Sequence, residues 1–265
     1  MAIDPNAFYT GGIAVRTYDL FLEGGPFEGD IDFYRACARR FGKSVLELGA
    51  GTGRVAIPLA QDGCTITGLD LAPAMLDLAA QRIAALSPEA AARIDLVRGN
   101  MVGFDLKRTF DWIVIAARAF QHVIEPEQQR AALRAMHRHL KPGGYLVMHL
   151  FDPRLEFCLP DAPAPQAARE VWDPVRGCRV RRTIIARHND PLRQLVGEQL
   201  RLEAFDQAGT VVAAEETSWA LRWTLRQEMA WLLELCGFRP VEQWSDFHGT
   251  PPAYGKEQVW VARAV

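Results

Sequence analysis

The sequence predicts an α/β fold in which a doubly wound, mostly parallel seven-stranded sheet carries an antiparallel β meander inserted after its fifth strand. Three observations support this prediction. Short apolar strands alternate with helical segments from residue 43 to residue 152, a pattern typical of parallel βαβ units. A glycine-rich loop follows the first of these strands. After Phe151 the chain changes to long alternating runs between prolines, which is typical of antiparallel strands.

The individual elements follow from their apolar patterns. The expected strands are Ser44–Leu48, Cys64–Leu69, Ile94–Val97, Trp112–Ile115, Tyr145–Met148, Val241–Trp244 and Gln258–Val261. The expected helices are Gly29–Phe41, Val55–Gln61, Ala74–Leu86, Pro126–Leu140 and Arg226–Cys236. The meander is expected in the runs Val180–Arg187, Val196–Phe205 and Val211–Trp223, with turns at Asn189–Pro191 and Gln207–Gly209.

These patterns divide the chain into three parts. Residues 1–42 are expected to form an N-terminal helical lead, residues 43–152 with 226–265 the α/β domain, and residues 153–225 an inserted lid. Ligands of open α/β sheets bind outside the carboxyl ends of the strands. An insertion after the fifth strand is therefore expected to cover the binding pocket.

Composition excludes several classes of protein. The 265 residues include 30 basic and 32 acidic side chains, which gives no electrostatic surface for nucleic acid or an anionic membrane. No apolar run approaches the ~20 residues of a membrane span, and the first residues lack the features of a secretory signal. The five cysteines are never spaced C-x-x-C, which argues against a disulfide framework or a zinc site. We expect a cytoplasmic enzyme with no metal.

The segment Glu47–Gly53, of sequence E-L-G-A-G-T-G, carries the most specific signal. Glycines after a first strand let the backbone approach a nucleotide-like ligand, and the helix that follows offers free N–H groups. The dinucleotide fingerprint G-x-G-x-x-G needs a third glycine where this chain has Arg54. A phosphate loop would need a Lys-Ser or Lys-Thr pair, which is absent. Both phosphate-binding interpretations are therefore weakened.

The pattern E/D-x-G-x-G-x-G resembles the first motif of the class I S-adenosylmethionine-dependent methyltransferases. Four further landmarks of that family follow in order: Asp70 with Leu71–Leu76 (L-A-P-A-M-L), Gly99–Met101 (G-N-M), Phe110–Val114 (F-D-W-I-V) and Leu140–Gly144 (L-K-P-G-G). The resemblance is detailed from Val45 to Phe151 and looser beyond. It implies a Rossmann-like fold, S-adenosylmethionine (SAM) as cofactor, S-adenosylhomocysteine (SAH) as product, and a small molecule as methyl acceptor.

The resemblance also implies which residues hold the cofactor. Asp70 is expected to accept hydrogen bonds from the ribose diol. Glu47 is expected near the ammonium group, and the Asn100 amide oxygen near the adenine amino group, where the family more often has a carboxylate. The full expected set is Tyr18, Glu47, Gly49, Ala50, Gly51, Asp70, Leu71, Met75, Asn100, Met101, Ala116 and Ala117.

Methyl transfer from a sulfonium is an in-line displacement that depends mainly on orientation, so the family has no universal catalytic residue. His122, which follows the fourth strand, is a candidate general base, and Tyr18 of the lead is a second candidate catalytic residue. Arg118 is a candidate ligand for an acceptor carboxylate. Trp219 of the insertion is a candidate contact for the acceptor.

The leading hypothesis is methyl transfer to a nitrogen, oxygen or carbon atom of a small molecule. A protein methyltransferase is the first alternative, because recognition of a protein could lie anywhere on the lid. A non-catalytic SAM-binding module is the second, since fold alone does not determine function. A NAD-dependent oxidoreductase is third, because Arg54 replaces its glycine. The alternating insertion is also compatible with a homodimer.

Overall fold

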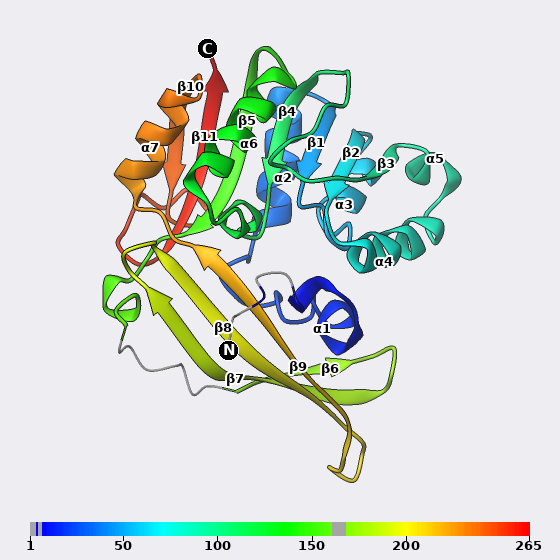
Figure 1. The fold of residues 1–265 in the computed structure, drawn as a ribbon. Coiled ribbons are helices and arrows are strands. Elements are labelled where there is room, and N and C mark those ends of the chain that lie inside the picture. The colour runs from blue at the N-terminus through cyan, green and yellow to red at the C-terminus, as the bar shows by residue number, and fades with distance from the viewer. Residues whose placement is uncertain (1–3, 5–6, 161–167) are drawn as a thin grey trace.

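The computed structural model describes residue 4, residues 7–160 and residues 168–265. Within these residues a seven-stranded sheet, sheet A, lies above a four-stranded sheet, sheet B, in the view of Figure 1. Sheet A has the strand order β10-β11-β5-β4-β1-β2-β3. Strand β11 runs antiparallel to both of its neighbours, β5 and β10, and all other neighbouring strands of sheet A are parallel. The predicted doubly wound, mostly parallel sheet is confirmed.

Helices cover both faces of sheet A. The sheet consists of β1 (Ser44–Leu48), β2 (Thr65–Asp70), β3 (Ile94–Arg98), β4 (Phe110–Ile115), β5 (Leu140–Phe151), β10 (Phe238–Trp244) and β11 (Glu257–Ala264). One hydrophobic core lies between the sheet and helices α2 (Asp30–Phe41) and α3 (Ala56–Gln61), and a second lies beneath α6 (Pro126–Arg138) and α7 (Arg226–Leu235). Burial on both faces explains why the central strands are continuous apolar runs.

Two further helices lie beside the edge of sheet A that β3 forms. They are α4 (Pro73–Ala84) and α5 (Pro88–Ala91). Helix α4 begins with Pro73, whose missing N–H is harmless in a first turn. It ends two residues earlier than its apolar pattern predicts. Helix α6 also ends early, because Leu140 is already the first residue of β5.

The inserted segment forms the predicted antiparallel meander. Sheet B has the order β6 (Arg169–Asp173), β7 (Cys178–Asp190), β8 (Leu195–Phe205) and β9 (Val211–Arg222). Strand β6 was not predicted. The first turn begins two residues later than predicted. Asn189 and Asp190 still pair with β8, so the turn occupies residues 191–194. The turn at Gln207–Gly209 is confirmed.

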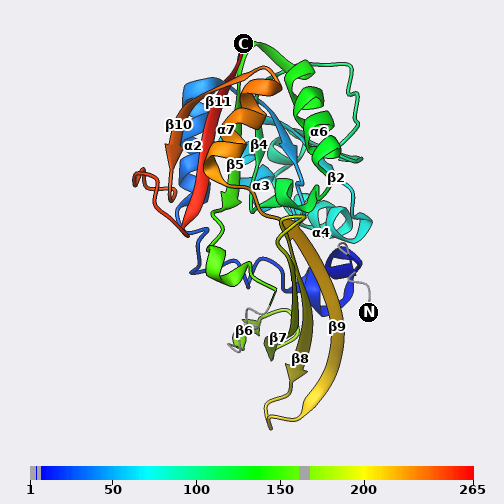
Figure 2. The ribbon, with the colours of Figure 1, turned by 60° about the vertical axis from the view of Figure 1, so that its left-hand side comes forward.

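The part of the N-terminal lead that precedes α2 lies between the two sheets. It contains η1 (Ala7–Tyr9) and α1 (Gly12–Arg16), and Figures 1 and 2 both place α1 beside β9 and below sheet A. A third hydrophobic cluster joins Phe8 and Phe21 of this segment to Val180 and Leu202 of sheet B. Two further short helices, η2 (Ala119–His122) and η3 (Leu155–Phe157), follow β4 and β5. None of the described helices is long and apolar enough to cross a membrane.

Candidate functional site

The candidate site lies where the carboxyl ends of β1, β2 and β4 face the lead and sheet B (Figure 1). Parallel strands bring their carboxyl ends to one edge of a sheet, so the loops after β1, β2 and β4 meet there. The sequence candidates Gly49, Asp70 and Ala116 come from these three loops. The insertion follows β5 at the same edge, which is why sheet B lies opposite.

The glycine loop has no room for side chains at Gly49 and Gly51. Gly49 and Gly51 have φ angles of 73° and 54°, which disfavour residues with a Cβ. A Cβ on Gly49 would lie 2.6 Å from the Cβ of Ala119, and one on Gly51 would lie 3.3 Å from Cε of Met75. The N–H groups of Gly49 and Ala50 both donate to the Leu69 carbonyl, which folds the loop against β2. The loop therefore forms a cradle of bare backbone.

Asp70 closes this cradle from the end of β2. Its Oδ2 accepts the Gly51 N–H at 2.7 Å, and its Oδ1 accepts the Ala72 N–H at 2.8 Å. Burial raises the pKa of the Asp70 carboxyl, and these backbone hydrogen bonds oppose the shift. A carboxylate has about four acceptor positions, so each oxygen can still accept a hydroxyl hydrogen. Asp70 fits the ribose-binding role expected of it.

Glu47 lies buried beneath the loop with an unsatisfied oxygen. Its side chain is 2% exposed, and Oε2 has no hydrogen-bond partner among the described residues. Burial raises the pKa of Glu47 to about 8, although the nearby Arg54 lowers it. A bound ammonium group would supply the missing hydrogen bond and charge, so Glu47 fits the cofactor role predicted for it.

Arg54 explains why the dinucleotide fingerprint fails here. Its guanidinium forms a two-pronged ion pair with Asp30 of α2, at 3.0 and 2.5 Å, and Asp30 is almost fully buried. Glycine at this position would remove the partner of a buried carboxylate. The side chain at this position therefore attaches α2 to the glycine loop instead of opening space for a pyrophosphate.

The residues expected around adenine differ in how far they are exposed to solvent. Leu71 is 51% exposed, whereas Met75 is buried against the glycine loop. Asn100 is exposed, and its Oδ1 accepts the Val102 N–H at 2.9 Å in a local turn. Met101 packs against the core beneath α6. The Asn100 amide oxygen has a second lone pair that stays available to a ligand.

The loop after β4 contains strained backbone. Ala117 and Arg118 have φ angles of 48° and 65°, in a region that residues with a Cβ seldom adopt. Ala116, just before them, is buried. Two successive left-handed residues reverse the chain tightly and bring η2 back toward Gly49. Strain of this kind is concentrated at functional sites and is held in place by the surrounding structure.

A tyrosine and a histidine that are far apart in the sequence meet at the site. The Tyr9 hydroxyl and His122 Nε2 are 2.7 Å apart, and the two rings are perpendicular. Burial lowers the pKa of His122 to about 4 and raises the pKa of Tyr9 well above its usual value. Tyr18 lies beside Tyr9, and burial raises its pKa to about 12, with a further contribution from Asp70. The site thus joins Tyr9 and His122 to the predicted Tyr18.

Arg118 is already paired within the protein. Its guanidinium donates to both oxygens of Glu257 at 3.1 and 2.6 Å, and the same carboxylate contacts His149 Nε2 at 2.8 Å. Arg118 also lies over the rings of Phe27 and Phe151. The structure thus gives Arg118 a structural carboxylate partner. Whether it also binds an acceptor carboxylate stays a prediction.

Trp219 lies on the face of sheet B that packs against the lead. It is half-buried and packs against two hydrophobic clusters, one that contains Leu200 and one that contains Val196. The site residues that sequence reasoning missed are Tyr9 and Glu257. Neither belongs to a motif, and both reach the site only through contacts with distant parts of the chain.

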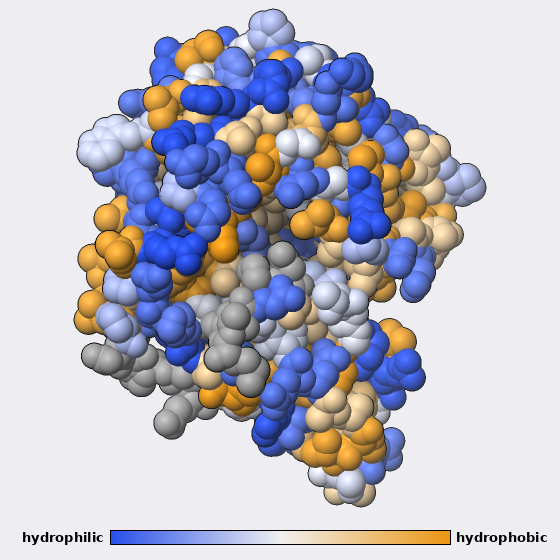
Figure 3. Space-filling view, in the orientation of Figure 1, coloured by the Kyte–Doolittle hydropathy of each residue, from blue (hydrophilic) through white to orange (hydrophobic). Residues whose placement is uncertain are grey.

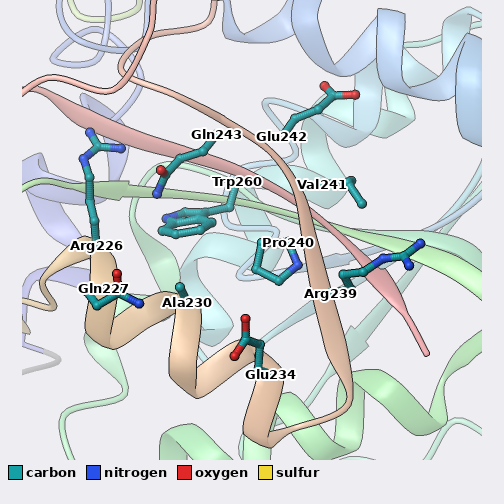
Figure 4. Close-up of a pocket in the computed structure, with 10 residues that line it drawn as sticks. All are labelled: Arg226, Gln227, Ala230, Glu234, Arg239, Pro240, Val241, Glu242, Gln243 and Trp260. Carbon is teal, nitrogen blue, oxygen red and sulfur yellow. The ribbon is translucent and has the colours of Figure 1, made fainter.

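A separate surface pocket of about 370 Å³ lies between α7 and β10 (Figure 4). Arg226, Gln243 and Trp260 are among the side chains that line it. It is near the edge of sheet A opposite β3, and none of the predicted site residues lines it. Among the described residues, no group of three or more histidine, cysteine or carboxylate side chains could hold a metal ion.

The glycine cradle, the acidic residue that ends β2 and the antiparallel β11 define a Rossmann-like domain of the methyltransferase type. Comparison with known proteins gives the same class. Residues 45–144 match the family model described as a methyltransferase domain. The central part of the chain is therefore similar to class I SAM-dependent methyltransferases, and the cofactor that this similarity supports is SAM.

Curated relatives match the central part of the chain. It is 30% identical over 141 residues to a cypemycin N-terminal methyltransferase of Streptomyces sp., a match that covers 53% of this chain and 55% of the relative. It is 32% identical over 107 residues to the mitochondrial ubiquinone biosynthesis O-methyltransferase of Schizosaccharomyces pombe, covering 40% of this chain and 37% of that protein. The chain thus spans about half, or less, of the length of these relatives.

Solved structures match nearly the whole fold. The CcbJ methyltransferase from Streptomyces caelestis superposes with a TM-score of 0.72 at 24% identity, covering 91% of this chain and 97% of that chain. The sugar N-methyltransferase KedS8 from Streptoalloteichus sp. gives a TM-score of 0.72 at 23% identity, covering 100% and 98%. At this identity the similarity shows the fold, including sheet B.

Proposed function

We propose that this protein transfers a methyl group from SAM to an amine of a small molecule. One observation carries the cofactor half of the proposal: bare backbone at Gly49 and Gly51 lies between a ribose-binding carboxylate, Asp70, and a buried, unsatisfied carboxyl, Glu47. The lead and sheet B face this site from the other side, which favours an acceptor small enough to fit beneath them. Structural neighbours that are described as sugar methyltransferases support this acceptor class.

The acid–base groups of the site favour an amine over a hydroxyl. Bound SAM supplies an activated methyl group, so the protein has to orient the acceptor and exclude water. His122, with its pKa near 4, is neutral at pH 7 and is too weak a base to ionise a hydroxyl. A neutral amine needs no prior deprotonation. With an unprotonated Nε2, His122 accepts from the Tyr9 hydroxyl, whose oxygen is then available to accept from the amine N–H.

Tyr18 is proposed to cover the cofactor instead of moving a proton. Its pKa of about 12 keeps the phenol neutral, and its electrostatic interactions with both Asp70 and Arg118 support a position near the carboxyl ends of β2 and β4. A neutral aromatic ring at this position excludes water from the transferred methyl group. We therefore assign orientation of the acceptor to Tyr9 and His122, and shielding to Tyr18.

The test of cofactor binding is calorimetry with SAM, SAH and NAD. We expect micromolar binding of the two sulfur nucleotides and none of NAD. Asp70→Ala should weaken SAM binding at least tenfold, because the ribose loses its acceptor and the N–H groups of Gly51 and Ala72 lose theirs. Asp77→Ala, an exposed residue of α4, is the matched control and should bind normally.

Methyl transfer itself is tested with radiolabelled SAM and a panel of small amines and alcohols. We expect Tyr9→Phe to turn over amines at least tenfold more slowly than the wild type while its affinity for SAM is unchanged. This result would support the assigned roles. Binding of SAM without transfer to any acceptor would favour the non-catalytic alternative. Binding of NAD in place of SAM would contradict the proposal.

A homodimer stays a prediction. Figure 3 shows apolar residues gathered at the lower end of the molecule, where Figure 1 has the tip of the β8–β9 hairpin. Val211 and Val212 of this hairpin are 45% and 59% exposed. Analytical ultracentrifugation of the wild type and of Val212→Asp would show whether this tip associates with a second copy.

A further inference from the structure

The arginines of sheet B differ according to the face on which they lie. Residues of one strand alternate between the two faces of a sheet. Val180 and Ile184 of β7 pack against the lead, so Arg182 between them shares this inner face. Arg179 and Arg181 lie on the outer face, and both form ion pairs with Glu170.

Unlike Arg179 and Arg181, Arg182 has no carboxylate partner among the described residues. Its guanidinium lies over the ring of Phe21, 4.4 Å from the centroid, and no hydrogen bond or ion pair to it occurs there. Burial lowers its pKa, which shows that the charged group is partly removed from water. A cation held in this way is destabilised unless an anion approaches it.

The neighbours of Arg182 increase its need for an anion. Arg169 of β6 is directly opposite in the sheet register, and like charges in this position repel. Arg169 donates to the Phe21 and Glu23 carbonyls, and within the described part of the chain it has no carboxylate partner either. Two carboxylates of the inner face are already engaged: Glu198 is bound by Arg187, and Glu215 accepts the Ile13 and Ala14 N–H groups. Arg182 and Arg169 are therefore left without a carboxylate partner among the described residues.

The charge of Arg182 borders the candidate active site. Tyr18 packs against the hydrophobic cluster that contains Phe21, the residue over which Arg182 lies, and it interacts electrostatically with both Arg182 and Asp70. Tyr9 packs against Tyr18 and contacts His122. The cation of sheet B and the group that is proposed to orient the acceptor thus lie around the same aromatic residue of the lead.

We propose that Arg182, supported by Arg169, binds an anionic oxygen group of the methyl acceptor, either a phosphate or a carboxylate. This inference rests on the proposed function and narrows its substrate class to amines that carry a negative charge. A planar guanidinium can donate two parallel hydrogen bonds to either group, which sets the orientation of the acceptor as well as its affinity. The anionic end of the acceptor lies against sheet B, and its amine faces Tyr9.

The direct test measures anion binding without methyl transfer. SAH-saturated, isotopically labelled protein is titrated with inorganic pyrophosphate and, separately, with succinate, and NMR follows the arginine Nε–H signals and the backbone amides of β7. We expect saturable shifts at β7 with one of the two anions, and the anion that binds identifies the group. Arg182→Ala should weaken this binding at least tenfold, and Arg182→Lys should restore part of it.

Arg181→Ala is the matched control, because it removes a guanidinium from the opposite face of the same strand. It should leave anion binding unchanged. Absence of saturable binding by both anions, or equal binding by wild type and Arg182→Ala, would overturn the proposal. Anion binding without SAM binding or methyl transfer would count against the proposed function alone, so the two failures are distinguishable.

A kinetic test uses pairs of amines that differ only in a phosphate or carboxylate. We expect kcat/KM to favour the anionic member at least tenfold, and this preference should disappear in Arg182→Ala while the affinity for SAM is unchanged. Equal turnover of both members by the wild type would overturn the assignment of Arg182.

Discussion

At the scale of single residues, burial keeps two ionisable groups of the site, Glu47 and His122, mostly neutral. Glu47 has its pKa raised to about 8, and His122 has its pKa lowered to about 4. Both shifts have the same cause, because removal from water disfavours the charged form of an acid and of a base alike. Glu47 and His122 are therefore mostly uncharged before a ligand binds, and ligand binding is expected to move protons.

Glu47 is expected to release a proton when the cofactor binds. At pH 7 a carboxyl with a pKa of about 8 is mostly protonated, and a bound ammonium favours its ionised form. Calorimetry of SAH binding in two buffers with different ionisation enthalpies measures the protons released. The wild type should release up to about one proton more than Glu47→Gln. Equal release by both proteins would show that Glu47 does not face the ligand.

His122 is expected to make stability fall in acid. Between its unfolded pKa of about 6.5 and its folded pKa of about 4, the unfolded state binds a proton that the folded state does not. From pH 7 to pH 5 this amounts to about 2 kcal/mol of lost stability. Glu47 has the opposite sign, because its raised pKa makes the folded state bind the extra proton.

The difference between the wild type and His122→Gln therefore isolates the histidine. Urea unfolding at pH 7 and pH 5 should show that the wild type loses more stability over this range than the variant. A parallel pH dependence of both proteins would contradict the burial of His122 in a neutral form.

At the scale of elements, a few polar contacts attach the lead and sheet B to the α/β domain. Asp19 of the lead accepts from the Thr52 hydroxyl of the glycine loop and from Arg82 of α4. Gln121 of η2 donates to the Arg222 carbonyl at the end of β9 and accepts from the Phe151 N–H of β5. The lead and the meander thus meet the cofactor loop and the strand ends through defined contacts.

Glu215 of β9 is expected to stabilise α1. Its two carboxylate oxygens accept the Ile13 and Ala14 N–H groups at 2.8 and 2.6 Å, at the beginning of a helix with no side-chain cap of its own. Glu215→Ala should destabilise the protein by about 1–2 kcal/mol. Hydrogen exchange of residues 12–17 should accelerate.

Glu216→Ala is the control for this prediction, because Glu216 lies on the outer face and forms an exposed ion pair with Arg201. Such pairs contribute little, so we expect a change of less than about 1 kcal/mol. An equal effect of both substitutions would show that Glu215 does not hold the helix.

At the scale of the whole molecule, sheet A and sheet B have separate cores. Two clusters cover the faces of sheet A, whereas the third lies between the lead and sheet B. Phe21 belongs to the third cluster, is 2% exposed and lies under Arg182. Loss of its ring should weaken the lead and sheet B together, without direct effect on the cores of sheet A.

Phe21→Ala is therefore expected to destabilise the protein by about 3 kcal/mol or more. Hydrogen exchange should accelerate in β7 and β8, while β1 and β4 keep their protection. Equal loss of protection in all four strands would show that the two sheets unfold as one unit.

By itself, the sequence determined the parts of this protein that depend on local patterns. Continuous apolar strands, helix periodicity and the spacing of Gly49, Gly51 and Asp70 predicted sheet A, its cofactor loop and the class of protein, because each signal is confined to a short segment. The alternation of apolar and polar residues likewise predicted sheet B, although not its short strand β6.

Only the tertiary structure decided which distant side chains meet. Tyr9 reaches His122, and Arg118 is paired with Glu257, 139 positions away. The strand register alone placed Arg182 on the face toward the lead without a carboxylate partner. These contacts depend on how the lead and sheet B pack against the strand ends, and no local pattern of the chain encodes that approach.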